Sequence, residues 1–79
     1  SFYSDFAAHF AASTLPSLVR SVNSQVGNRG FNSVRAAHDR ALIDELVRRG
    51  IDVSAVFDGT TLSFAHHVEL DNNRLVIKK

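Results

Sequence analysis

The sequence predicts an α+β fold: a two-layer single domain in which three helices precede a three-stranded antiparallel β-meander. Three observations carry this prediction. Apolar residues recur every three or four positions up to Gly50 and every second position after it. Glycine, asparagine and one proline fall between the periodic segments, where turns and caps need them. The 79 residues have room for one domain, with a helical half at 1–49 and a β-meander half at 50–79.

Three helices are expected in the amino-terminal half, near residues 2–12, 15–26 and 33–48. Thr14 can cap the second helix with its side chain, and Pro16 falls in the first turn, where a proline is tolerated. Asn32 or Ser33 can cap the third helix in the same way. Gly50 follows the last turn of this helix, a position where glycine often ends a helix.

The polar face of the third predicted helix carries charges of both signs at a spacing of four residues. The oppositely charged pairs are Arg35–Asp39, Arg40–Asp44, Asp44–Arg48 and Glu45–Arg49. Pairs at this spacing stabilise a helix by only about 0.2–0.5 kcal/mol each and are typical of a solvent-exposed surface. We therefore expect Asp39, Asp44 and Glu45 to lie on the exposed side of this helix.

Three strands are expected in the carboxyl-terminal half, near residues 51–57, 60–70 and 74–78. The two-residue turns Asp58–Gly59 and Asn72–Asn73 join them, because Gly and Asn tolerate the left-handed backbone that such turns need. The predicted registers place Phe57 opposite Thr60, Ala55 opposite Leu62, Val53 opposite Phe64, Asp71 opposite Arg74, Leu70 opposite Leu75 and Val68 opposite Ile77. Apolar residues of both hairpins then share one face, with His66 at its margin.

A stripe of aromatic residues marks the first helix: Phe2, Phe6 and Phe10 recur every four residues, with Tyr3 beside them. Two interpretations are open. The stripe closes the hydrophobic core, which is the usual role of an apolar helix face, or it forms a contact with a partner or with a second copy. A membrane-surface helix is not expected, because the polar face of this helix has no Lys or Arg.

The sequence contains no pattern that carries a known chemistry. Cysteine is absent, which excludes disulfides and thiolate ligands. The histidines, His9, His38, His66 and His67, lack metal-binding spacing, and the last two point to opposite faces of a predicted strand. His38 and Asp39 are neighbours on a predicted helix and are not expected to face each other. No nucleophile or nucleotide-binding motif is present. We therefore expect neither an enzyme nor a cofactor or metal site.

The order of the elements allows an alternative function, DNA binding. Two helices with a Gly-containing turn between them, followed by a hairpin, resemble a winged helix-turn-helix domain. In that arrangement, residues 33–49 would form the recognition helix and residues 51–65 the wing. The candidate nucleic-acid contacts are Arg29, Asn32, Ser33, Arg35 and Arg40. The acidic residues on the same helix and the net charge of only +1 disfavour this alternative.

A non-catalytic protein-interaction or assembly module is the function that the sequence favours. Hydrophobic residues make up 44% of the chain and charged residues 22%, which is typical of a globular domain. The core of so short a chain is modest, so self-association would add stability. The predicted edge strand at 51–57 could also accept a strand from a partner. No apolar run is long enough to span a membrane and no signal-peptide pattern is present, which favours a cytoplasmic location.

Overall fold

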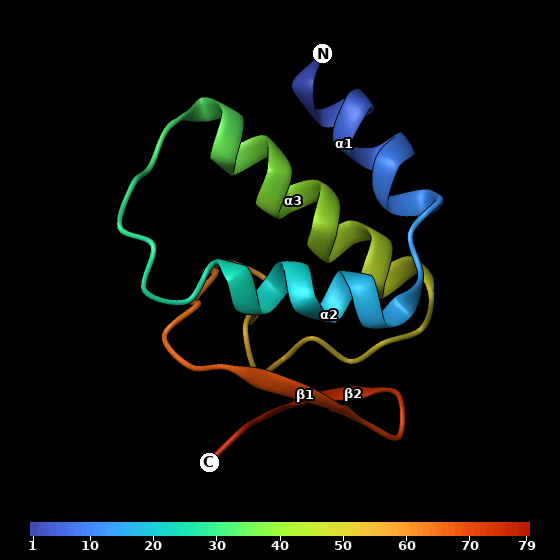
Figure 1. The fold of residues 1–79 in the computed structure, drawn as a ribbon, viewed down its shortest axis with the longest axis vertical. Coiled ribbons are helices and arrows are strands. Elements are labelled where there is room, and N and C mark those ends of the chain that lie inside the picture. The colour runs from blue at the N-terminus through green and yellow to red at the C-terminus, as the bar shows by residue number, and fades with distance from the viewer.

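A computed structural model of the chain describes all 79 residues and has the predicted α+β class. Three helices precede a two-stranded antiparallel sheet, where the sequence predicted three strands (Figure 1). The elements are α1 (Phe2–Ala11), α2 (Leu15–Ser24), α3 (Ser33–Arg48), β1 (Val68–Asp71) and β2 (Arg74–Ile77).

A side-chain cap begins each helix, at Ser1, Thr14 and Asn32. In each case the side-chain oxygen accepts a hydrogen bond from the backbone N–H three residues further along. Pro16 lies in the first turn of α2, as expected. The predicted helices are therefore confirmed, although α1 ends one residue earlier and α2 two residues earlier than predicted.

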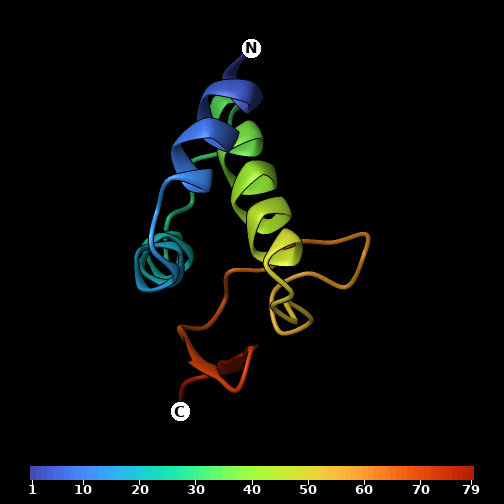
Figure 2. The same ribbon diagram turned by 90° about the vertical axis from the view of Figure 1, so that its right-hand side faces the viewer.

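The third helix, α3, lies at the centre of the helical layer. Figure 1 shows α1 and α3 side by side and running in the same direction, with α2 crossing beneath them; Figure 2 shows the same arrangement from the side. The first helix packs mainly on α3, whereas α2 contacts both α3 and β1. The two strands lie at the far end of the molecule from the amino terminus.

One hydrophobic core joins the helices to the chain that follows them. Its fully buried side chains come from every helix, from both strands and from the segment after α3. The core residues are Phe10, Leu18, Val22, Ala41, Leu42, Ile43, Leu46, Ile51, Val53, Val56, Val68 and Leu75. The α3 side chains in this core are Ala41, Leu42, Ile43 and Leu46, whereas Val34 and Val47 of the same helix are exposed.

The strand predicted at 51–57 is wrong. After Ile51 and Val53 the chain turns, and the N–H groups of Val56 and Phe57 both donate to the carbonyl of Val53 at 2.9 Å. The turn has a physical reason: it brings Val56 to the buried side together with Val53, whereas a strand would have buried Ala55. The backbone therefore follows the alternating pattern of the sequence only as far as Val53.

A single bridge keeps the segment after α3 beside the sheet. The N–H of Asp52 donates to Asn73 O, and the N–H of Leu75 donates to Asp52 O, both at 2.9 Å. This bridge is parallel to β2. The edge predicted to accept a partner strand is therefore a short, already paired segment.

The first predicted hairpin has a different register. Phe57 pairs with Leu62, not with Thr60, so the loop contains four residues and not two. The Asp58 carboxylate accepts hydrogen bonds from the N–H groups of Thr60 and Thr61 at 2.8 and 2.7 Å, which lowers the pKa of Asp58. This side-chain turn competes with the tight hairpin that Asp–Gly usually forms. Of the predicted strand at 60–70, only residues 68–70 lie in a strand, β1, which continues to Asp71.

The second predicted hairpin is confirmed. Its register pairs Val68 with Ile77, Leu70 with Leu75 and Asp71 with Arg74, and Asn72 and Asn73 have left-handed φ angles of 53° and 65°. The common apolar face is only half covered, because the core reaches Val68 and Leu75 but leaves Leu70 and Ile77 exposed. His66, expected at the margin of this face, is exposed as well.

A side chain from α2 occupies the outer edge of β1. The Nδ2 group of Asn23 donates to Val68 O at 2.9 Å, and Val68 N donates to Oδ1 of Asn23 at 2.8 Å. The amide thus makes the two hydrogen bonds that a neighbouring strand would make at this position. It joins the helical layer to the sheet and covers part of an edge that would otherwise be open to pairing.

Truncation of Leu46 tests the placement of α3. Leu46 is fully buried, so Leu46→Ala should lower the free energy of unfolding by roughly 2–5 kcal/mol. Val47 is the matched control: it is 53% exposed, and Val47→Ala should change stability by less than about 0.5 kcal/mol. Urea unfolding followed by circular dichroism measures both. Equal effects would contradict the orientation of α3.

Candidate interaction surface

The aromatic stripe of α1 is divided between core and surface. Phe10 is 2% exposed and belongs to the core, Phe6 is half-buried, and Phe2 is 57% exposed. The His38 ring lies edge-on to Phe6 and Phe10, with centroids 5.1 and 5.2 Å apart. Phe2 lies one turn before Phe6 on α1, at the end of the stripe that faces solvent. The core interpretation is therefore confirmed for Phe10, and for the exposed Phe2 the contact interpretation stays a prediction.

Tyr3 lies on the other flank of α1. Its hydroxyl donates to Oδ2 of Asp44 on α3 at 2.6 Å, and this bond raises the pKa of the phenol. The Arg40 guanidinium pairs with the same carboxylate at 3.1 Å and stands over the Phe57 ring, 5.9 Å from its centroid. Tyr3 thus attaches the first turn of α1 to α3, even though 40% of the residue is exposed.

Arg49 attaches the other end of α1. Its Nη2 group donates to the carbonyls of Phe10 and Ser13 at 3.0 and 2.6 Å, and Nε donates to Oε2 of Glu45 at 2.6 Å. The last carbonyls of a helix have no partner within the helix and carry its negative end. A guanidinium held by a carboxylate is well suited to satisfy them.

Glu45 is buried, which corrects the expectation that it faces solvent. Its side chain is 6% exposed and lies between Arg48 and Arg49. The hydrogen bond from Arg48, together with that from Arg49, lowers the pKa of Glu45 although burial opposes the shift. The predicted Glu45–Arg49 pair is confirmed, but it is not solvent-exposed. Through the hydrogen bond from Arg49 to Phe10 O, it helps to join α3 to α1. Asp44 is half-buried and pairs with Arg40; no pair with Arg48 forms.

Asp39 is the second predicted surface acid that is buried. Its side chain is 8% exposed and contacts Arg35 at 3.5 Å and His38 at 3.0 Å. The contact with Nδ1 of His38 corrects the expectation that these helix neighbours do not meet. It orients the imidazole that Phe6 and Phe10 pack against. The dyad is therefore part of the α1–α3 contact.

Arg35 holds the loop between α2 and α3. Nε of Arg35 donates to Oε1 of Gln25 at 2.9 Å, and Nη1 donates to the carbonyls of Asn28, at 2.7 Å, and Gly30. The ion pair with Asp39 fixes the guanidinium on its other side. The loop from residue 25 to residue 32 is thus attached to α3 by polar contacts.

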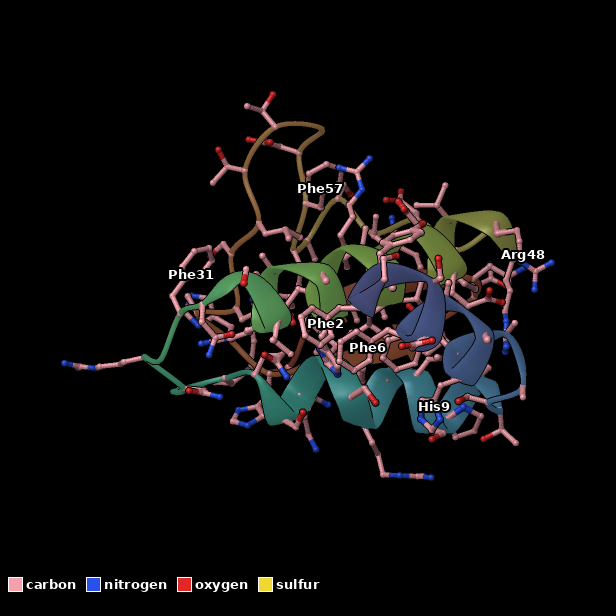
Figure 3. All side chains as sticks on the ribbon, turned by 90° about the horizontal axis from the view of Figure 1, so that it is seen from above. Phe2, Phe6, His9, Phe31, Arg48 and Phe57 are labelled. Atoms are coloured by element: carbon pink, nitrogen blue, oxygen red, sulfur yellow. The ribbon has the colours of Figure 1, made fainter.

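We call Phe2, Phe31 and Val34 the apolar end of the molecule. Phe31 is 80% exposed, Phe2 57% and Val34 38%. Figures 1 and 2 place the starts of α1 and α3 at the same end, and Figure 3 shows Phe31 outside the start of α3. Val34 also lines an open hollow of about 350 Å³, whose other lining residues are Phe6, Gln25, Asn28, Gly30, Asn32, Arg35 and His38.

The candidate nucleic-acid contacts do not form one open set. Asn32 caps α3, Arg35 holds the loop, and Arg40 pairs with Asp44. Arg29 and Ser33 are exposed, and their side chains make no hydrogen bond or ion pair within the chain. The predicted wing, 51–65, consists of turns and isolated bridges and not of two paired strands.

Two further features of the molecule concern ligands and membranes. No group of three or more His, Asp or Glu side chains is arranged to hold a metal ion. A second open hollow, lined by Asp5, Phe6, His9, Phe10, Ser21 and His38, lies between α1 and α2. None of the three helices has the length and apolar character needed to cross a membrane.

Sequence reasoning missed three residues that shape this surface. Phe31 follows a run of Gly, Asn and Arg, and a large aromatic residue in such a loop is itself a signal of surface function. Arg49 and Asn23 act over long sequence separations, on α1 and on β1. No local pattern indicates partners that lie 36 and 45 residues away.

The buried carboxylate of Glu45 predicts a pH dependence of stability. Because folding lowers its pKa, the stabilisation is complete above the ordinary glutamate pKa, about 4.3, and is lost as the pH falls through the lower pKa of the folded state. Glu45→Gln should cost roughly 1–3 kcal/mol at pH 7, and the difference should shrink in acid. Thermal unfolding across pH measures this. Glu69→Gln, at an exposed site, is the control; a pH-independent deficit at Glu45 would contradict the ion-pair role.

DNA binding stays a prediction, and we expect it to be weak. Three of its five candidate residues already have partners, and the net charge is +1, so few phosphates can be neutralised. Fluorescence anisotropy with short random duplexes, at low and at physiological salt, should show weak binding that salt abolishes. Submicromolar affinity at physiological salt, lost on Arg35→Ala and Arg40→Ala in folded protein, would support the winged-helix alternative.

Protein-family models, curated proteins and solved structures were compared with the chain, and none matches it.

Proposed function

We propose that the chain is a protein-interaction module and that the apolar end, Phe2, Phe31 and Val34, is its contact surface. The exposure of Phe31 carries the proposal: a phenyl ring that is 80% in water, on a loop held by Arg35. Exposed aromatic residues of this size promote aggregation unless a binding partner covers them. Aromatic residues, phenylalanine included, are also enriched at protein interfaces.

The way the loop is held supports this assignment. The hydrogen bonds of Arg35 satisfy the carbonyls of Asn28 and Gly30, and Asn28 in turn accepts from Gly30 N through its side chain at 3.1 Å. The loop is therefore ordered before any partner arrives. A surface ordered in advance loses less conformational entropy on binding, which favours affinity.

The hollow beside the apolar end adds complementary chemistry. Phe6 and Val34 provide apolar walls, whereas Gln25 and Asn32 provide polar groups. A partner side chain can enter this hollow while Phe2 and Phe31 pack on the surface around it. Apolar centres with polar surroundings are the usual composition of a protein interface.

The test is a pull-down in which a double variant and a control variant are compared with the wild type as baits. We expect Phe2→Ser combined with Phe31→Ser to leave stability nearly unchanged, because both side chains are exposed, and to abolish capture of a specific partner from native extracts. Val47→Ser is the matched control, an exposed apolar residue at the other end of α3, and should capture the partner as the wild type does. Quantitative mass spectrometry of the captured proteins is the readout.

Two results would contradict the proposal. One is identical capture by the double variant and the wild type. The other is unfolding of the double variant, measured by circular dichroism, because that would place Phe2 and Phe31 in the core.

A further inference from the structure

We infer that the hollow between α1 and α2 binds a quaternary ammonium group. This inference goes beyond the proposed function, because the hollow is not part of the apolar end: none of Phe2, Phe31 and Val34 lines it. The aromatic rings of the hollow, its single carboxylate and its few hydrogen-bond acceptors point to this ligand chemistry.

Aromatic rings form most of the wall of this hollow. Of its six lining residues, four carry rings: Phe6, His9 and Phe10 from α1 and His38 from α3. Phe6 and Phe10 are nearly parallel, at 21°, and the His38 ring stands across them at 86° and 74°. The His9 ring stands at 63° to Phe10. Rings at such steep angles meet like the walls of a corner, and grouped aromatic rings attract cations through their negative faces.

The one acidic residue of the hollow, Asp5, strengthens this preference. Asp5 is exposed and makes no ion pair within the chain. No Lys or Arg lines the hollow, so no cation of the chain itself occupies it. A carboxylate without a partner, next to aromatic rings, attracts a positive ligand and repels an anion.

The polar groups of the hollow favour a quaternary ammonium over a primary one. A primary ammonium has three N–H donors, and each needs an acceptor once water is removed. The only side chains of the hollow with oxygen acceptors are Asp5 and Ser21, and Nδ1 of His38 already contacts Asp39 at 3.0 Å. A quaternary ammonium has no N–H group, so contact with the rings and with one carboxylate is sufficient for it.

The size of the hollow suits a small organic cation. Its volume is about 460 Å³, and ligand pockets usually measure about 300–1,000 Å³. Because the hollow is open, a bound ligand stays partly hydrated. We therefore expect weak binding, with a Kd of roughly 1–10 mM.

The experiment is an NMR titration of isotope-labelled protein at about pH 8, where imidazole rings ordinarily carry no positive charge that would repel the ligand. Choline is the probe, and the neutral alcohol in which carbon replaces the nitrogen of choline is its matched control. Choline should shift the resonances of Asp5, His9 and Ser21. The neutral alcohol has the same shape and should bind about tenfold more weakly.

Two variants test the residues that carry the inference. Asp5→Asn should weaken choline binding about threefold. Phe6→Leu keeps an apolar side chain but removes the ring, and it should weaken binding about fivefold.

Two matched controls repeat these changes outside the hollow. Asp71 is exposed and makes no ion pair, and Phe64 is half-buried against the core. Neither residue lines the hollow, so Asp71→Asn and Phe64→Leu should change the Kd for choline by less than about twofold. Circular dichroism establishes that every variant is folded.

A second titration identifies the source of the ammonium group. A short peptide with one trimethylated lysine is compared with choline and with the same peptide unmodified. Tighter binding of the trimethylated peptide than of choline would assign the group to a protein, and the reverse order would assign it to a free small molecule. The unmodified peptide should bind more weakly than the trimethylated one.

Three results would overturn the inference. One is the absence of shifts at the hollow with either ammonium probe up to about 50 mM. Another is equal binding of choline and its neutral analogue, and the third is an effect of Asp5→Asn no larger than that of Asp71→Asn. None of these results bears on the apolar end, which the pull-down tests separately.

Discussion

The position of α1 depends on one buried interaction, the hydrogen bonds from Arg49 to the last carbonyls of that helix. Because α1 packs mainly on α3, a contact between these two helices decides where its aromatic side chains lie. Glu45 holds the Arg49 guanidinium in position for these bonds, because Nε of Arg49 donates to Oε2 of Glu45 at 2.6 Å. Phe10 then enters the core, Phe6 contacts His38, and Phe2 remains exposed. The division of the aromatic stripe between core and surface follows from this placement.

The same helix uses its other charged residues to build the remaining surface. Arg35 and Asp39 form a second partly buried pair, which orders the loop that presents Phe31. Buried ion pairs give modest net stability, because desolvation offsets much of the attraction, but they are intolerant of displacement. An apolar contact can slide, whereas a guanidinium bonded to two carbonyls and a carboxylate cannot do so without losing hydrogen bonds. Polar contacts in α3 therefore determine geometry, and the core determines stability.

Local signals in the sequence were sufficient for the helices and for one hairpin. Caps at Thr14 and Asn32 and the turn Asn72–Asn73 act within a few residues, so their effects can be predicted from spacing alone. The segment after Gly50 could not be predicted in this way. Alternation of Ile51 and Val53 continues for only one step, and burial of Val56 against the helices then favours a turn. Likewise, the spacing of charges in α3 indicates which residues pair, but exposure depends on whether another helix covers the pair. Glu45 is buried beside Arg48 and Arg49, and Arg49 in turn bonds to the end of α1.

The candidate surface was predicted in part for the same reason. Periodicity identified the aromatic stripe, yet periodicity cannot distinguish a helix that is covered along its whole length from one that is covered at one end. In this fold α1 packs mainly on α3, which buries Phe10 and leaves Phe2 57% exposed. Phe31 has no periodic context at all, and its exposure follows from the hydrogen bonds of a residue four positions later, Arg35. The apolar end is thus assembled from a helix terminus and a loop that meet only in the folded chain. The polar contacts that hold them leave the apolar side chains facing water, ordered and uncovered, which is the condition in which a partner gains the most from binding them.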